Sequence, residues 1–354
     1  MHLKYSSEHE SENCRSIVYF LDRATSPQAE TIVRDLCWRA KYVDPLNRAF
    51  VLAQTFHAFL PEHLRSLFPK DTLGLVDLPS TPQGKKEHKD LAIVTVIGPE
   101  LKALLRILGK LPTAMADQKS GDYSYWFAKV ARPNNTSLDI VLTVVAEQRN
   151  VPCALAVDHI LADFDARLIM LIGIAGGVYG KVNLGDVVYA LQVYDYEGCR
   201  LEMVKYLWFL HKLIKRPRPR FWNTSRRINV AMQQFDERQM RQILHESMRN
   251  VNPDELPSEW RDLEPKVHLG SVAAGEKLIA DGSLKRMRWI VDDLIRAGTM
   301  EDSGFAQAAE HNKVEWCIFR GVSDFANPRK DDKWQATAAL SASAAGITAA
   351  KMLL

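Results

Sequence analysis

From residue 90 onward, short apolar runs alternate with segments of helical periodicity, and this alternation is the feature that most limits the possible folds. Residues 91–97 (LAIVTVI) have the pattern of a buried strand, and residues 100–108 follow with leucines at helical spacing. The pattern recurs in the apolar runs 139–145, 168–172, 186–193 and 314–319, with helical runs such as 152–164 between several of them. Strands that alternate with helices predict a layered α/β/α domain.

A change of composition divides this domain from the residues before it. Residues 79–90 (PSTPQGKKEHKD) are rich in proline, glycine and charge, as linkers commonly are. We therefore predict an accessory domain at 1–80, a linker at 81–90 and the main domain at 91–354. Apolar positions at helical spacing predict that the first domain is small and mostly helical, and its role in regulation, oligomerisation or partner binding stays open.

Charge and cysteine usage exclude several functional classes. The formal net charge is +3, from 46 basic and 43 acidic residues, which argues against a general binder of nucleic acid. The longest apolar run, residues 168–178, is too short to cross a membrane, and the start of the chain lacks the apolar core of a secretory signal. The five cysteines stand singly, so we expect a cytoplasmic protein with neither a metal site nor a cofactor.

Residues 199–266 interrupt the alternation with a basic insertion whose densest part is 212–220 (KLIKRPRPR). One interpretation is a solvated surface with exposed basic helices, because runs of charge are usually solvated. The other interpretation is an arm that recognises phosphate. In the second case the candidate phosphate ligands of the arm are Lys212, Lys215, Arg216, Arg218 and Arg220. Lys102, which lies outside the insertion, is a further phosphate candidate.

Four sequence blocks follow one another along the chain: residues 97–105 (IGPELKALL), 173–177 (GIAGG) with 184–188 (LGDVV), 270–279 (GSVAAGEKLI), and 300–301 (ME) with 320–324 (RGVSD). In this order they resemble the nucleoside phosphorylase and nucleosidase superfamily, most closely its methylthioadenosine/adenosylhomocysteine nucleosidase branch. The resemblance covers residues 90–354. It implies a three-layer α/β/α phosphorylase-like domain with a mixed central sheet.

The resemblance also implies a role for each matched residue. Asp324 is expected to protonate the purine with support from Ser323, and Glu100 to orient the attacking water. Glu301 is expected to accept hydrogen bonds from the 2′ and 3′ hydroxyls of the ribose. The other implied substrate contacts are Met300 beside Glu301, Arg320 elsewhere in the site, and Ala175, Gly176, Leu278 and Ile279 in the base pocket.

The chemistry of glycosidic cleavage agrees with these roles. A purine base is a poor leaving group, so the reaction needs an acid at the base and a carboxylate near the water. Each site carboxylate also has a purely structural alternative. Asp324 would cap a helix or pair with Arg320, Glu301 would be a solvated charge at a helix start, and Glu100 would be a first-turn acid favoured by the helix dipole.

Two further features bear on the substrate. Leu278 stands where the methylthioadenosine enzymes have an aromatic residue, and the loss of a stacking face disfavours that substrate. Residues 329–335 (RKDDKWQ) resemble a segment of nucleosidase effectors in bacterial antiphage and NLR-like proteins, or else they form a charged surface turn. The leading hypothesis is a hydrolase of adenine nucleosides or nucleotides, ATP included, in antiviral defence.

Three alternatives stay open at this point. A phosphorylase would use inorganic phosphate in place of water, and a non-catalytic module would sense nucleotides through the same fold. A dinucleotide-binding dehydrogenase is disfavoured because GIAGG lacks the GxGxxG spacing. The resemblance also implies a homo-oligomer, and a regulatory protein partner would act through residues 1–80.

Overall fold

The computed structural model describes residues 86–132, 136–205, 213–252, 256–258, 262–277, 281–327 and 332–354, with only the backbone described for 198–205 and 213–218. The chain divides into two units, Met1–Lys85 and Lys86–Leu354, and all the described residues belong to the second unit. The predicted N-terminal domain at 1–80 therefore lies outside the described residues.

The end of the predicted linker is a strand. β1 (Glu87–Thr95) begins four residues before the apolar run and pairs in parallel with a later strand, so that Glu87 faces Phe164 in the register. Its charged start is accommodated because Lys89 is buried, with Nζ 2.6 Å from Glu87 Oε1 and 4.6 Å from the centre of the Phe127 ring. The contact across the sheet, rather than local composition, decides the conformation here.

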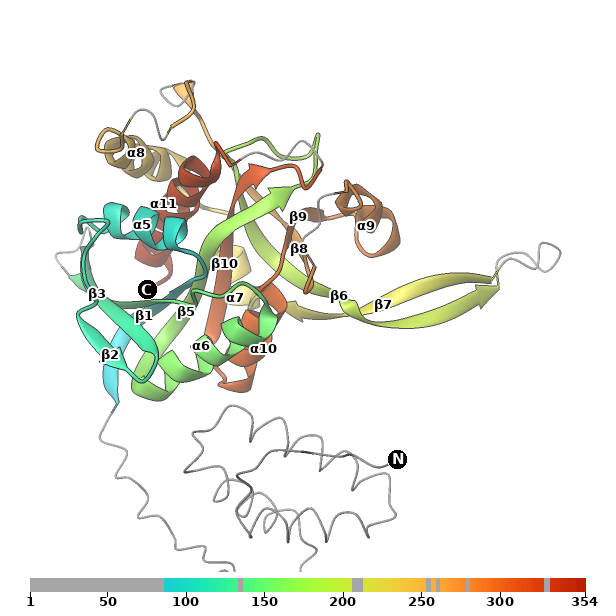
Figure 1. Cartoon of the computed structure of the whole chain (residues 1–354), viewed down its shortest axis with the longest axis horizontal. Helices are drawn as coiled ribbons and strands as arrows, with labels where there is room; N and C mark the ends of the chain where they lie inside the picture. The colour runs from blue at the N-terminus through green and yellow to red at the C-terminus, as the bar shows by residue number, and fades with distance from the viewer. Residues whose placement is uncertain are drawn as a thin grey trace, which may run out of the picture. The chain divides into compact units, whose positions relative to one another are not determined.

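A mixed sheet forms the centre of the unit (Figure 1). Its other strands are β2 (Gln118–Ser120), β3 (Tyr123–Ala131), β4 (Ser137–Val144), β5 (Phe164–Gly177), β6 (Val187–Lys205), β7 (Leu213–Asn223), β8 (Val267–Ala274), β9 (Ile295–Thr299) and β10 (Glu315–Asp324). The sequence predicted β4, β5 and β10 to within about five residues and the start of β6, but it ended β6 at residue 193 instead of Lys205. It did not predict β2, β3, β7, β8 or the short strand β9, which proves important for the site.

The strand pairing brings the ends of three strands together. β5 pairs in parallel with both β1 and β10, whereas β10 pairs antiparallel with β6. β6 continues to β8, β8 to β9, and β9 returns to the last residues of β5, where Gly176 faces Gly298. The pairings thus close into a ring, and the carboxyl-terminal ends of β5, β9 and β10 meet at one edge.

Helices cover both faces of the sheet and confirm the three-layer α/β/α architecture. On one face α11 (Gln335–Leu353) packs against α5 (Gly98–Ile107), α8 (Glu237–Met248) and α7 (Arg226–Met232), and on the other α10 (Asp302–His311) packs against α6 (Asn150–Asp163). Figure 1 shows α5, α8 and α11 on one side of the strands and α6 and α10 on the other. α9 (Leu284–Ile290) lies beside β9. None of the helices described has the length and apolar character needed to cross a membrane.

The predicted C-terminal helix, residues 336–350, is the buried α11. Its alanines and serines allow a close approach to β10, where a Cβ at Gly321 would overlap the backbone of Ala338. Small side chains on both elements therefore set the short distance between this helix and the sheet. The closeness matters for the site because α11 begins beside the end of β10.

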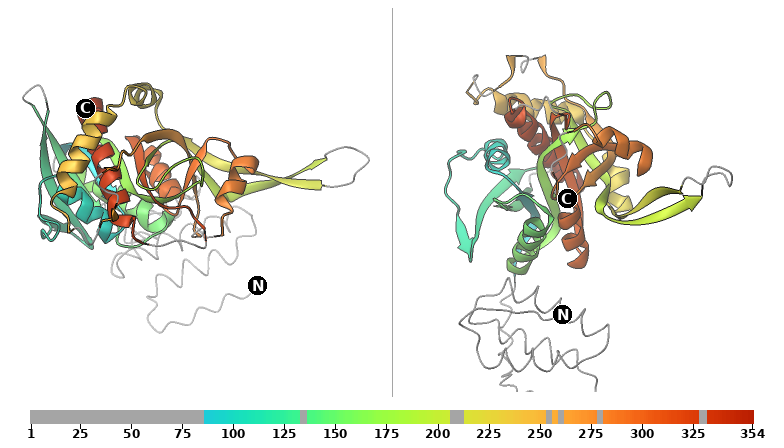
Figure 2. Two further views of the ribbon diagram at one scale, coloured as in Figure 1. Left: turned by 90° about the horizontal axis from the view of Figure 1, so that it is seen from above. Right: turned by 45° about the vertical axis from the view of Figure 1, so that its right-hand side comes forward.

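The basic insertion expected at 199–266 differs from the expectation of exposed basic helices. Its first part belongs to a long hairpin in which β6 pairs antiparallel with β7, and the far half of this hairpin projects from the body of the domain (Figures 1 and 2). Pro217 and Pro219 disfavour a helix there and fit a strand that has a partner on one side. Among the described residues of the insertion, helices begin at Arg226, and α8 buries Met240 and Leu244.

Candidate active site

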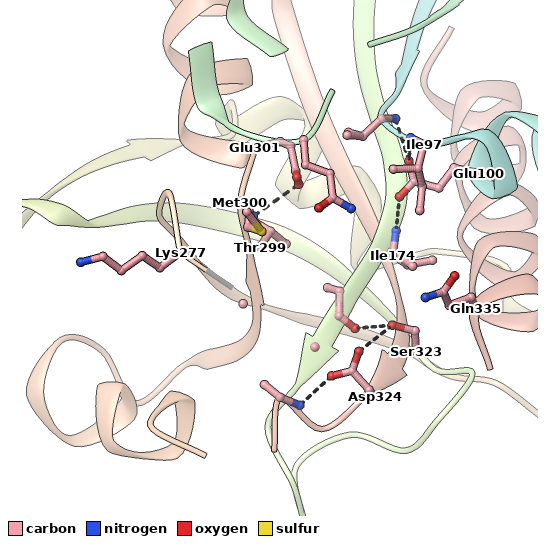
Figure 3. A pocket seen from close by; sticks show the side chains of 16 residues that line it. Ile97, Glu100, Ile174, Lys277, Thr299, Met300, Glu301, Ser323, Asp324 and Gln335 are labelled. Atoms are coloured by element: carbon pink, nitrogen blue, oxygen red, sulfur yellow. Dashed lines mark hydrogen bonds between the residues drawn. The ribbon is translucent and has the colours of Figure 1, made fainter. Parts of the chain in front are cut away.

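A pocket lies at the edge where β5, β9 and β10 end, beside the first turn of α5 (Figure 3). It brings together Glu100, Glu301 and Asp324, which come from three separate segments of the chain. The lining residues are Val96, Ile97, Glu100, Gln148, Ile174, Ala175, Gly176, Lys277, Gly298, Thr299, Met300, Glu301, Ser323, Asp324, Ala326 and Gln335. The sequence blocks that lie far apart in the chain therefore meet in one cavity.

Asp324 is the last residue of β10 and faces Gly176 of β5 in the register. It is 7% exposed, so most of its surface is withdrawn from water. Its Oδ2 accepts a hydrogen bond from Ser323 Oγ at 3.1 Å, and its Oδ1 accepts one from the backbone N–H of Ala326 at 2.7 Å. These two donors fix the orientation of the carboxyl group in the pocket wall.

Glu100 lies in the first turn of α5 and is 2% exposed. Its Oε2 accepts hydrogen bonds from the backbone N–H groups of Val96 at 2.7 Å and Ile97 at 3.1 Å, and its Oε1 accepts one from Ile174 N–H at 2.8 Å. The side chain therefore satisfies donors at the start of its own helix and also ties α5 to β5. Glu100 is therefore the first-turn acid of its helix, as in the structural alternative, and it also lines the pocket.

Glu301 and Met300 follow β9, and Glu301 caps the start of α10. Glu301 is 6% exposed, so it is not the solvated helix-start charge of the structural alternative. Its Oε2 accepts a hydrogen bond from the backbone N–H of Met300 at 3.3 Å. In Figure 3 Glu301 and Gln335 lie on opposite sides of the pocket.

Arg320 is fully buried behind these carboxylates and joins them. Its Nη2 lies 3.3 Å from Glu301 Oε2 and in close contact with Asp302 Oδ1, and its Nη1 lies 3.8 Å from Glu100 Oε1. The guanidinium thus holds Glu100 and Glu301 from behind. It does not line the pocket itself. Among the described residues, no group of three or more His, Cys, Asp and Glu side chains is arranged to hold a metal ion.

One guanidinium among three buried carboxylates shifts the ionisation of the group. The pKa of Glu301 is raised to about 7, mainly by burial and further by the negative charges of Asp302 and Glu100, against the lowering effect of Arg320. Burial also raises the pKa of Glu100, against the effect of Arg320 and of three backbone N–H donors. Burial lowers the pKa of Arg320, but the three carboxylates outweigh it and hold that pKa above its ordinary range.

The glycine block at the end of β5 serves two purposes. Ala175 and Gly176 line the pocket, and a Cβ at Gly176 would lie 3.1 Å from Asp324 Oδ1. A Cβ at Gly173 would overlap Arg320 Nη1 and Glu100 Oε1. Gly176 thus lies in the pocket, as the resemblance implied, whereas Gly173 makes room for the buried ion contact.

Two of the base-pocket candidates, Leu278 and Ile279, lie outside the described residues. Several pocket residues were not among the candidates from the sequence, namely Gln148, Lys277, Thr299 and Gln335. Lys277 lies within the matched block 270–279 and is 85% exposed, with Nζ 3.6 Å from Glu197 Oε1. In Figure 3 its side chain points away from the carboxylates. A polar residue within a matched motif is the signal that could have identified Lys277.

The phosphate candidates are spread over different places. Lys102 is exposed on α5 and lines a second pocket next to the first. Arg220 is exposed on β7, whereas Lys212 and the side chains of Lys215, Arg216 and Arg218 are not described. No described residue of the β6–β7 hairpin lines the pocket that holds Glu100, Glu301 and Asp324.

A family model described as the phosphorylase superfamily matches residues 90–354. The chain is 27% identical to "ATP nucleosidase Cap17" of Escherichia coli strain KTE188 over 71% of its own length and 48% of that protein. It is 24% identical to "Death domain-containing ATP nucleosidase" of Amphimedon queenslandica over 67% of its own length and 43% of that protein. The chain thus spans about half the length of the curated relatives it matches.

Among solved structures, the chain is similar to the 5′-methylthioadenosine/S-adenosylhomocysteine nucleosidase of Neisseria meningitidis in complex with methylthio-immucillin-A. The TM-score is 0.53 at 18% identity, and the match covers 74% of this chain and 99% of that one. At this identity the similarity establishes the fold.

Proposed function

The chain belongs to the phosphorylase superfamily, and from this premise we propose that it hydrolyses the N-glycosidic bond of an adenine nucleoside or nucleotide. The observation that carries the proposal is the pocket in which Glu100, Glu301 and Asp324 meet. Two relatives bear the name ATP nucleosidase, which supports ATP as the substrate. The substrate of this chain is then a purine riboside that carries phosphates on C5′.

In the proposed reaction, water attacks C1′ of the ribose while the bond from C1′ to the base nitrogen breaks. The base leaves with the bonding electron pair, and Asp324, oriented by Ser323 and Ala326 N–H, donates a proton to it. Glu100 orients the water on the other side of the sugar and accepts its proton as the bond to C1′ forms. Transfer of that proton to solvent and reprotonation of Asp324 from solvent then restore both carboxyl groups. The products are the free base and ribose with its 5′ substituent.

Glu301 has a separate task in this proposal. As a carboxylate it accepts hydrogen bonds from the 2′ and 3′ hydroxyls, and hydrogen bonds to a charged acceptor are worth roughly 1.5–3 kcal/mol. Arg320 positions Glu301 and Glu100 from behind and does not touch the substrate. Met300, Ala175 and Gly176 supply walls for the sugar and base.

The pocket favours water over inorganic phosphate as the acceptor. Among its described lining residues the cation is Lys277, which points away from the carboxylates. A phosphate ion beside Glu100 and Glu301 would need cations directed at it to offset the repulsion. Arg320 does not serve because its guanidinium faces Asp302, Glu301 and Glu100.

A direct assay tests the proposal. The protein is incubated with adenosine, AMP, ATP and methylthioadenosine, each with and without inorganic phosphate, and free adenine and the sugar product are measured by chromatography. We expect adenine together with ribose or ribose phosphate at a rate that does not depend on phosphate. Formation of ribose 1-phosphate would identify a phosphorylase, and ATP binding without adenine release would identify a nucleotide sensor.

We extend the proposal to the whole chain. The resemblance of residues 329–335 to defence effectors supports a role in antiviral defence. One relative is named a death domain-containing ATP nucleosidase, which supports an accessory role for residues 1–80. The described Cys153 and Cys317 are free and buried, which fits a cytoplasmic protein. Light scattering of the full chain tests the homo-oligomer, and pull-down with a fragment of residues 1–80 tests the regulatory partner.

A further inference from the structure

A second pocket borders the catalytic one, between the exposed side of α5 and the start of α11. Its volume is about 800 Å³, and Gln335 lines both pockets. α5 also takes part in both, because Glu100 faces the catalytic pocket while Lys102 and Arg106 line the second. A ligand that passes Gln335 would extend from one pocket into the other.

The second pocket is rich in positive charge. Lys102 and Arg106 stand four residues apart on α5 and so share one face of that helix. Lys333 adds a third cation from the segment before α11, and the one acidic side chain among the described lining residues is Asp332. Asp332 Oδ1 accepts a hydrogen bond from Gln335 Nε2 at 2.6 Å. Three cations against one carboxylate favour an anionic ligand.

The start of α11 adds to this preference. The helix is 19 residues long, begins at Gln335, and has no side-chain hydrogen bond from its N-cap residue, Trp334. The N–H groups in the first turn of such a helix and its dipole favour negative charge. Trp334, Gln335 and Ala336 all line the second pocket, so the positive end of the helix is part of its wall.

The position of the second pocket matches the free end of the sugar. A ribose whose base faces Asp324 and whose 2′ and 3′ hydroxyls face Glu301 directs C5′ away from Glu301, and Gln335 lies on that opposite side (Figure 3). Resting on the proposed function, we propose that the second pocket binds the 5′ phosphates of a nucleotide whose adenosine part occupies the catalytic pocket. Lys102, Arg106 and Lys333 then select nucleotides over nucleosides.

This assignment replaces most of the phosphate ligands expected from the sequence. Of the six candidates, Lys102 lines the second pocket. The described residues of the β6–β7 hairpin, Arg220 among them, line neither pocket. Lys277 lies in the catalytic pocket but pairs with Glu197 and points outward.

The test compares nucleotide selectivity in matched variants of the full chain. For wild type, Lys102→Gln/Arg106→Gln and Lys333→Gln, kcat/KM is measured with ATP and with adenosine. We expect the ratio of the two values to fall at least about tenfold in the double variant, because charge-assisted contacts to the phosphates are lost. The control is Lys285→Gln/Arg286→Gln on α9, which removes two exposed charges outside both pockets and should keep the ratio.

Other outcomes have defined meanings. An unchanged ratio in the double variant, or an equal fall in the α9 control or in Arg220→Gln, would overturn the second pocket as the phosphate subsite. Melting temperatures identify variants that fail to fold. If the double variant does not fold, the ratio of kcat/KM values is measured in Lys333→Gln, which changes an exposed side chain. If no substrate releases adenine, the proposed function has failed, and calorimetric binding of ATP and adenosine to the same variants still decides the subsite.

Discussion

Arg320 and its three carboxylates dominate the chemistry of the pocket at the scale of single residues. Buried charges are costly unless they are paired, and one guanidinium cannot fully offset Glu100, Glu301 and Asp302 together. As a consequence, the carboxyl group of Glu301 releases its proton only near neutral pH, because burial and the neighbouring carboxylates raise its pKa to about 7. The residue proposed to bind the ribose hydroxyls therefore changes its charge within the physiological range.

This ionisation gives a prediction for Glu301→Gln. In the wild type, kcat/KM for ribosides should rise as the pH increases through about 7, because the ionised form of Glu301 is the better acceptor for two hydroxyls. The variant should lose this rise and also the preference for ribosides over 2′-deoxyribosides. Initial rates from pH 5 to 9 with both sugars measure it. A wild type that cleaves both sugars equally well would contradict the role of Glu301.

The same shift predicts an effect on stability. Between its ordinary pKa of 4.5 and about 7, Glu301 keeps its proton in the folded state and releases it in the unfolded state, so folding loses stability as the pH rises through this window. Relative to wild type, Glu301→Gln should therefore gain on the order of 1–3 kcal/mol between pH 5 and pH 8, as measured by urea unfolding. Glu246→Gln, exposed on α8, is the control and should show no such gain.

A third prediction concerns the proposed acid. Asp324→Asn should fold and bind substrate normally but release adenine at least about 100-fold more slowly, because an amide has no acidic proton to donate. Ser323→Ala, which removes one orienting donor, should have a smaller effect. Single-turnover rates separate the chemical step from binding. Turnover close to wild type in Asp324→Asn would remove this residue from the mechanism.

At the scale of elements, the site depends on how closely α5, β5 and β10 approach one another. Glu100 accepts hydrogen bonds from the loop before α5 and from Ile174 on β5, so it links a helix to a strand. Arg320 reaches the same point from β10, and Gly173 on β5 leaves the space in which the two side chains meet. We therefore expect the geometry of the pocket to depend on the absence of a side chain at Gly173.

Gly173→Ala tests this dependence. The added methyl group would overlap Arg320 and Glu100, and we expect a loss of roughly 1–3 kcal/mol in the free energy of unfolding together with a lower rate of adenine release. Denaturant unfolding and the adenine assay measure the two effects. At Gly98 a methyl group would meet no atom within 4 Å, so Gly98→Ala is the matched control. Equal behaviour of the two variants would show that the contact at Gly173 tolerates displacement.

At the scale of the whole described unit, two pockets of different character adjoin through Gln335. One is lined mainly by carboxylates and small residues, and the other carries Lys102, Arg106 and Lys333. A substrate with a neutral sugar and an anionic tail matches both. Methylthioadenosine, with an apolar 5′ group, would place that group among charged side chains, and we expect it to be a poorer substrate than ATP.

Ionic strength provides a prediction at this scale. Raising the salt concentration from about 50 mM to about 300 mM should lower kcat/KM for ATP more than for adenosine, because contacts to the exposed Lys102 and Lys333 are screened. The measurement is a series of initial rates at constant pH. A salt dependence that is the same for both substrates would mean that charge contributes nothing to the recognition of the 5′ end.

The sequence by itself determined the fold class and, through the resemblance of its four blocks, the residues that meet in the pocket. Asp324 ends the block that follows the predicted strand at 314–319, whereas Glu301 follows β9, which the apolar pattern did not predict, so its assignment depended on the resemblance. Glu100 lies in the helix that follows the predicted first strand, and its role was likewise implied by the resemblance. These signals are local, and local patterns of apolar and small residues are what a sequence displays directly.

Only the tertiary structure decided which side chains meet across the chain. Arg320 contacts Glu100 because β10 lies beside β5, and Gln335 lines both pockets because α11 starts near the end of β10. Lys102 and Lys333 line one pocket because α5 packs on α11. The projecting hairpin of β6 and β7 likewise places most of the dense basic segment, residues 213–220, away from the body of the domain. Such contacts join residues far apart in sequence, and their distances follow from the packing of whole elements rather than from any local pattern.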